Sequence, residues 1–123
     1  FSSTILPRTA ANGYVVAPIY ISGTVGTGTG GGVCQVSSTL YAAMRYANLP
    51  ATERYPHSLP VTYLPDGYDA AIAGTHKDMK FKNTFDTPIY IEGKANVTNT
   101  FSQPLLIQAS ASGGTLTVTL TLQ

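Results

Sequence analysis

Apolar residues recur at steps of three and four through residues 33–48, and this spacing predicts a helix with one apolar face. The residues on that face are Val33, Val36, Leu40, Met44 and Ala47. The other side carries Cys34, Ser37, Ser38, Tyr41 and Arg45. Asn48 favours a left-handed helix end, and Pro50 prevents the helix from continuing. The pattern therefore predicts one main helix, with Cys34 in its first turn.

The rest of the chain is typical of β-structure, because short apolar runs alternate with Gly, Pro, Asp or Asn. The predicted strands are 13–23, 59–64, 68–73, 78–83, 88–93, 103–109 and 115–122. The glycine-rich segment 25–32 is expected to be a loop, and 65–67 and 112–114 are expected to be turns. The predicted fold is α+β, with a largely antiparallel sheet and a helix whose N-terminus carries the cysteine.

Length and composition narrow the possible functions. A chain of 123 residues without internal repeats predicts a single domain, 1–123. Its net charge is +1, and it has no basic cluster, which argues against a nucleic-acid partner. No apolar stretch approaches the ~18 residues of a membrane span. The chain begins at Phe1, so we expect a processed protein or a domain excised from a longer one.

Cys34 is the only cysteine in the chain, which excludes an internal disulfide and a multi-cysteine metal site. A thiol in the first helical turn lies near the positive end of the helix dipole, which favours the reactive thiolate. Unpaired N–H groups there could hold an oxyanion, and the candidates are those of Gly31, Gly32, Val33 and Gln35. Free cysteines are also commonly inert core residues, so position alone leaves both interpretations open.

A thiolate that transfers acyl groups needs a proton carrier, and His57 is the candidate. It lies in "ERYPHSLP", between two prolines that stiffen the backbone. Asp69 is the first choice for a carboxylate that orients His57, with a backbone carbonyl as the alternative. His76 is expected to be a solvated turn residue. Two histidines and one cysteine at wide spacing do not predict a zinc site, and we expect no metal and no cofactor.

Three segments together resemble the VanW domain, named after an accessory protein of vancomycin-resistance clusters. They are "GGGVCQVSSTLYAAM", "ERYPHSLPVTYLPDGYDAAI" and "DMKFKNTFDTPIYI". The family's motif cysteine and histidine match Cys34 and His57, its arginine matches Arg54, and its G-x-D-A turn matches residues 67–70. Tyr55 stands where the family often has histidine, and residues 94–113 match only loosely.

The resemblance implies an extracellular protein of the bacterial envelope that acts on peptidoglycan stem peptides. Proteins with this domain have been implicated as cysteine L,D-transpeptidases, which form 3–3 cross-links and release D-Ala through a thioester. We expect a monomeric catalytic domain that is also capable of L,D-carboxypeptidase activity. Arg54 or Arg8 is expected to hold a stem carboxylate. The expected wall of the site consists of Ser37, Ser38, Tyr41, Ser58 and Tyr63.

Two other functions fit the same residues. In one, the chain is a non-catalytic module that binds peptidoglycan, and Cys34 is structural. In the other, it is a cysteine peptidase or amidase of the NlpC type, which also combines a cysteine at a helix start with a later histidine. The bond that is cleaved, if any, discriminates among the three.

Overall fold

The structure is a computed structural model that describes residues 1–96, 105–112 and 115–122, with side chains for residues 1–92. Its elements are α1 (Ser2–Ile5), the 3-10 helix η1 (Ala10–Asn12), β1 (Val16–Ile21), β2 (Thr24–Thr29), α2 (Val33–Tyr46), β3 (Ala51–Glu53), β4 (Lys80–Phe81), β5 (Tyr90–Asn96), β6 (Leu105–Ser112) and β7 (Thr115–Leu122). The predicted α+β class is confirmed, with α2 as the one long helix of the described residues.

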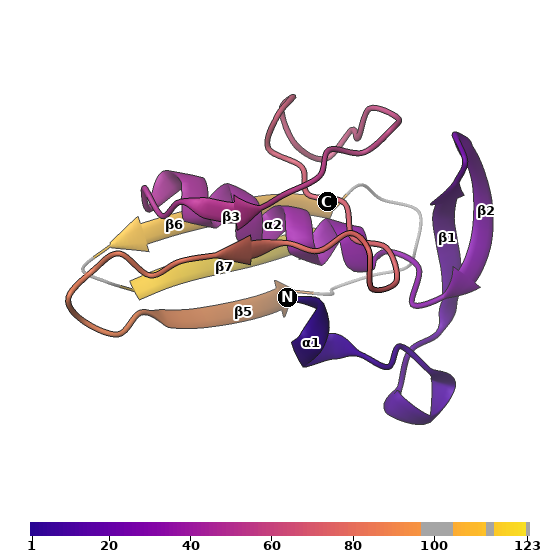
Figure 1. The fold of residues 1–123 in the computed structure, drawn as a ribbon, viewed down its shortest axis with the longest axis horizontal. Coiled ribbons are helices and arrows are strands. Elements are labelled where there is room, and N and C mark those ends of the chain that lie inside the picture. Colours follow the sequence, from indigo (N-terminus) through magenta and orange to yellow (C-terminus); the bar gives the residue numbers. More distant parts are fainter. Residues whose placement is uncertain (97–104, 113–114, 123) are drawn as a thin grey trace.

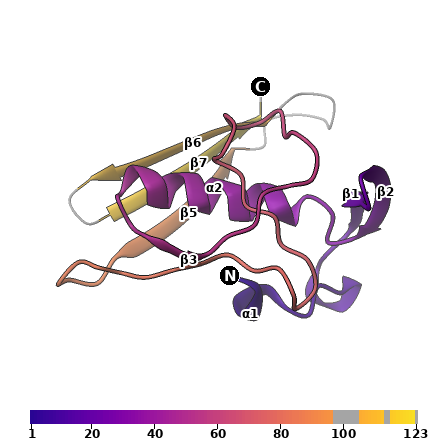
Figure 2. The ribbon, with the colours of Figure 1, turned by 45° about the horizontal axis from the view of Figure 1, so that its top comes forward.

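The strands form three small sheets arranged around α2 (Figure 1). A three-stranded sheet of order β5-β7-β6 lies on one side of the helix, and α2 packs against β6 and β7. The β3–β4 pair lies on the opposite side (Figure 2), and the β1–β2 hairpin stands beyond the start of α2. All pairings are antiparallel except that of β5 with β7. Within the described part of the chain, no helix is both long and apolar enough to cross a bilayer.

α2 begins directly after Gly32 and ends close to the predicted position. Asn48 has the predicted left-handed conformation, with φ 57°. The N–H of Leu49 then donates to the carbonyl of Met44 at 2.9 Å, which closes the helix end before Pro50. A short polar sequence signal was therefore sufficient to locate this boundary.

The predicted buried face of α2 is confirmed at Val33, Leu40, Met44 and Ala47, which pack in or against the core, but it is wrong at Val36 and incomplete at the serines. Val36 is 48% exposed, whereas Ser37 and Ser38 have no exposed surface. Their hydroxyls can be buried because both donate to the carbonyl of Ala70, at 2.6 and 3.3 Å, and Ser38 Oγ accepts the N–H of Ala70 at 2.9 Å. The fully buried helix residues are Ser37, Ser38, Thr39, Ala42, Ala43 and Met44.

Several strand predictions also need correction. Neither 59–64 nor 68–73 forms a strand. In the second segment, the backbone of Ala70 bonds to serine side chains of α2 instead of to a neighbouring strand. Residues 78–83 form only the short β4. The predicted loop 25–32 is largely β2, in which Gly26 and Gly28 leave room for isoleucine side chains of β1. The predicted runs 13–23, 88–93, 103–109 and 115–122 correspond to β1, β5, β6 and β7, and the expected turn at 112–114 lies mostly outside the described residues.

Candidate active site

Cys34 is the second residue of α2, and its thiol is half-buried against the backbone of the segment after Asp69. Its Sγ lies 3.4 Å from the carbonyl oxygen of Ile72 and 3.5 Å from the N–H nitrogen of the same residue. The first contact suits the thiol, which donates, and the second suits the thiolate, which accepts. Both protonation states therefore have a partner in the same place.

His57 is fixed by the carboxylate of Asp69. Oδ2 of Asp69 lies 2.7 Å from both the backbone nitrogen and Nδ1 of His57. Arg54 donates to Oδ1 and to the backbone carbonyl of Asp69, also at 2.7 Å. The side chain of His57 is 6% exposed, and His57 and Cys34 line the same cavity. The loop between Pro56 and Pro60 thus places the imidazole in the cavity of the thiol, and Asp69 fixes its orientation.

The electrostatics of the three groups are matched. Burial raises the pKa of the Cys34 thiol, but hydrogen bonds from His57 and Ile72 and the charges of His57 and Arg8 outweigh it, so the pKa lies below its ordinary value. The hydrogen bond with Cys34 raises the pKa of His57, burial lowers it, and Asp69 raises it again, which leaves it above its ordinary value. Opposite shifts of this kind favour a thiolate–imidazolium pair.

The carboxyl of Asp69 stays ionised beside this pair. Burial raises its pKa, but hydrogen bonds from His57 and the charge of Arg54 hold it below the usual range. A permanent negative charge behind the imidazole stabilises its protonated form. Arg54 donates two hydrogen bonds to Asp69, so it acts on the imidazole of His57 through this carboxylate.

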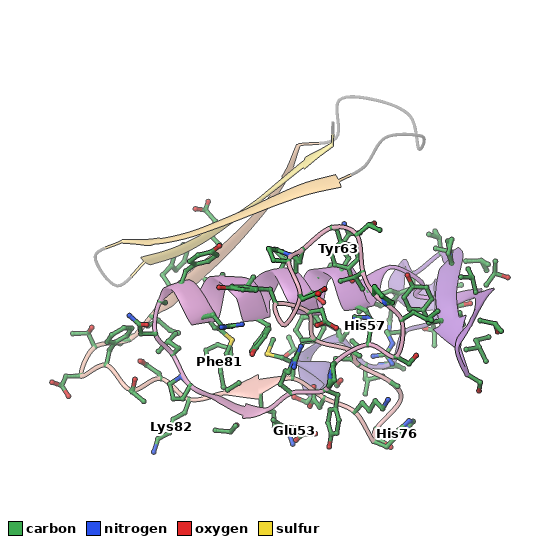
Figure 3. All side chains as sticks on the ribbon, turned by 90° about the horizontal axis from the view of Figure 1, so that it is seen from above. Glu53, His57, Tyr63, His76, Phe81 and Lys82 are labelled. Carbon is green, nitrogen blue, oxygen red and sulfur yellow. The ribbon has the colours of Figure 1, made fainter. Side chains whose placement is uncertain are left out.

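The thiol opens into a cavity of about 390 Å³. Its lining residues are Arg8, Pro18, Ile19, Tyr20, Thr29, Gly30, Gly32, Val33, Cys34, Gln35, His57, Tyr63, Ile72 and Ala73. The cavity thus lies between the hairpin, the start of α2 and the His57 loop. Figure 3 shows His57 and Tyr63 at the end of the helix that faces the hairpin.

The amides expected to hold an oxyanion differ in their availability. The N–H groups of Gly31 and Gln35 donate to carbonyls of the glycine turn, residues 28–32, at 3.1 and 3.0 Å. The N–H of Val33 donates to a carbonyl of the same turn at 3.4 Å. Those of Gly32 and Cys34 make no hydrogen bond to a described residue. Gly31 also lies outside the cavity lining, so its amide is not placed for an oxyanion site. Val33 and Gln35 line the cavity, but the turn uses their amides as well.

The expected wall residues divide into three groups. Tyr63 lines the cavity, and burial raises the pKa of its hydroxyl to about 12. Ser37 and Ser38 are sealed under Ala70, and neither they nor Tyr41 lines the cavity, so their expected wall role is wrong. The ring of Tyr41 packs against the core, and Cζ of Arg54 lies 5.2 Å from the centroid of this ring.

Ser58 lies on the other side of the imidazole, in a second cavity of about 270 Å³ that His57 also lines. It is therefore separated from the Cys34 cavity by the histidine. His76 occupies a turn closed by the bridge between Ala73 and Lys77, away from His57 (Figure 3). Among residues 1–96, 105–112 and 115–122, no three His, Cys, Asp or Glu side chains gather as a metal site.

Tyr20 is a site residue that sequence reasoning missed. Its ring meets that of His57 edge-on, with centroids 6.0 Å apart and an interplanar angle of 86°. It comes from β1, far from His57 in sequence. Only the expectation that a hairpin packs over the glycine turn could have found it.

Comparison with known proteins identifies the family of this chain. The family model described as VanW like protein matches residues 1–98. The uncharacterized protein YoaR of Bacillus subtilis (strain 168) is 37% identical over 120 residues, which cover 98% of this chain and 34% of that protein. The chain thus spans about a third of that relative's length. No solved structure matches it. Since the match includes the cysteine turn, the histidine loop and Asp69, this chain belongs to the VanW-like family.

Proposed function

We propose that this protein is a cysteine acyltransferase of the bacterial cell envelope, a peptidoglycan L,D-transpeptidase. Its donor would be a tetrapeptide stem, and its product a 3–3 cross-link with release of D-Ala. The observation that carries the proposal is that the Cys34 thiol and the His57 imidazole line one cavity, with the imidazole held at 2.7 Å by Asp69. A nucleophile and a base that share one cavity, with the base oriented by a third group, are typical of covalent acyl transfer.

In the first half-reaction, the Cys34 thiolate attacks the carbonyl carbon between the L-centre of the diamino acid and D-Ala. The developing oxyanion would be held by the N–H groups of Gly32 and Cys34, which have no partner among the described residues. The carbon–nitrogen bond breaks, and the His57 imidazolium gives its proton to the departing amine. The products are a thioester on Cys34 and free D-Ala.

In the second half-reaction, a side-chain amine of a neighbouring stem attacks the thioester carbonyl. Neutral His57 takes a proton from this amine as the new amide forms. The carbon–sulfur bond breaks and returns the thiolate, so the ion pair with imidazolium is restored. Attack by water instead of the amine shortens the stem, which is L,D-carboxypeptidase activity.

The direct test is incubation of the purified protein with disaccharide-tetrapeptides, followed by mass spectrometry. We expect release of D-Ala and formation of dimers, and we expect Cys34→Ala to abolish both. His76→Ala is the matched control for His57→Ala, because it removes an imidazole from a turn outside the site. Dimers formed by Cys34→Ala would overturn the mechanism.

The NlpC-type alternative uses the same three groups, and the same experiment separates it. Cleavage at another bond of the stem would assign the protein to the peptidases or amidases. The binding-module alternative requires an inert thiol. A half-buried sulfur that opens into a cavity, with its pKa lowered by His57, favours the catalytic interpretation over that one.

A further inference from the structure

Arg8 presents a buried cationic nitrogen that has no partner. Its Nη1 is inaccessible to solvent and makes no hydrogen bond in the described part of the chain. The other two arginines are satisfied, because Arg54 is bound to Asp69, and Arg45 donates to the Gly67 carbonyl and stacks on a tyrosine ring. A buried charged donor without an acceptor is costly, and a site that retains one is typical of ligand recognition.

The side chain of Arg8 is held over the glycine turn that precedes Cys34. A Cβ atom placed on Gly30 would lie 3.2 Å from Cβ and 3.3 Å from Cδ of Arg8. Gly30 also has φ +82°, so both its conformation and its close approach to Arg8 favour glycine. The turn thus holds the aliphatic part of Arg8 in place, and Arg8 also lines the cavity that contains Cys34.

Among the described residues, no carboxylate lines the cavity to pair with this guanidinium. None of its lining residues is Asp or Glu, and the partly buried acids Asp69 and Asp78 pair with Arg54 and with the N-terminus. The charge of Arg8 reaches the thiol, since it contributes to the lowered pKa of Cys34. An anionic group of the substrate, close to the reacting carbonyl, would complete the site.

We propose that Arg8 binds the terminal carboxylate of the leaving D-amino acid, an assignment that rests on the proposed function. That carboxylate lies one residue beyond the scissile bond, so the arginine selects stems that end there. The protein would therefore act on tetrapeptides and reject pentapeptides, whose carboxylate lies one residue too far. Arg prefers such a role because its planar fork matches a carboxylate with two parallel hydrogen bonds.

The test compares two donors that differ at one group. Both are stems with L-Lys and an amidated second residue, which removes the other carboxylates; one ends in a D-Ala carboxylate and the other in the D-Ala amide. The wild type should have a kcat/KM for release of the terminal residue about 10- to 100-fold higher on the carboxylate than on the amide. Arg8→Met should lower the first value much more than the second, so that the ratio of the two falls to near one. Arg8→Lys should recover part of the difference.

Lys82→Met is the matched control, since it removes one exposed positive charge outside the cavity and should keep the preference. If Arg8 acted only on the thiol, Arg8→Met would lower both values equally and keep their ratio, which would overturn the proposal. A wild type that releases the terminal residue equally from both donors would also overturn it while leaving the proposed function intact. Absence of release from every donor would instead reject the proposed function, and this assignment with it.

Discussion

Nδ1 of His57 lies 2.7 Å from Oδ2 of Asp69, and the same oxygen receives the backbone N–H of His57. A carboxylate that holds both the main chain and the ring of one histidine fixes its position and its rotation together. Nδ1 must carry the proton in this arrangement, which leaves Nε2 for the Cys34 thiol. The pair of residues thus decides which nitrogen can exchange a proton with the substrate.

The thiol of Cys34 should react with iodoacetamide at pH 6–7 faster than an ordinary cysteine. Its pKa is lowered, so the thiolate persists below the usual thiol range and is lost only as the pH falls through the lowered value. His57→Ala should move this inflection to higher pH, because the hydrogen bond and positive charge of the imidazole are removed. The alkylation rate against pH measures both, with the urea-unfolded protein as the reference. An inflection shared by the folded and unfolded chains would contradict the ion pair.

Asp69→Asn should lower kcat/KM for D-Ala release by at least about 10²-fold, the lower end of what a positioned acid–base group contributes. An amide keeps the shape of the carboxyl group but removes the charge that stabilises the imidazolium. Asp86→Asn is the control, since it neutralises an exposed acid outside both cavities. The alkylation profile should also change, because a less basic His57 stabilises the thiolate less. Equal activity of the two variants would exclude a role for Asp69.

The parts of the fold that could be predicted from the sequence are those encoded locally. The period of α2, its end at Asn48 and the placement of Cys34 in its first turn depend on residues within a few positions of one another. His57 and Asp69 could be nominated because the chain has only two histidines and six acidic residues, and His57 lies between two prolines. Their contact, however, depends on how the loop crosses the helix.

The parts that failed depend on distant partners. Ser37 and Ser38 lie on the polar side of the predicted helix, but in the structure they are buried and hydrogen-bonded to the backbone of Ala70. Residues 68–73 have the composition of a strand, yet their backbone groups are satisfied by these helix hydroxyls and by the Cys34 thiol. Arg8 and Tyr20 reach the site only because the hairpin and the segment before it fold over the glycine turn. The hydrophobic periodicity of a segment does not show which distant segments will contact it.

Ser38→Ala should destabilise the protein more than Ser37→Ala. Loss of the Ser38 hydroxyl leaves the buried N–H of Ala70 without an acceptor, which costs about 1–3 kcal/mol. After Ser37→Ala, the carbonyl of Ala70 still accepts from Ser38, so the expected loss is nearer 1 kcal/mol. Urea denaturation of the two variants measures the difference in unfolding free energy. An equal or reversed order would show that the Ala70 contacts do not carry this segment.

Gly31→Ala should displace the hairpin and lower activity. A Cβ on Gly31 would fall on the backbone carbonyl of Ala17, which cannot rotate away as a side chain could, so β1 would have to move. That movement would shift Tyr20 from the edge of the His57 ring and open the cavity. We expect kcat/KM for D-Ala release to fall by at least about tenfold, which corresponds to about 1.4 kcal/mol of transition-state stabilisation.

Gly13→Ala separates this effect from general backbone strain. Gly13 has φ +86° and open space around its Cα, so alanine there should cost about 1–2 kcal/mol of unfolding free energy without touching the site. Its kcat/KM, measured at a temperature where both variants are folded, should match that of the wild type. Full activity of Gly31→Ala would contradict this prediction, because the hairpin would then be able to shift without consequence for the thiol, the imidazole or the substrate between them.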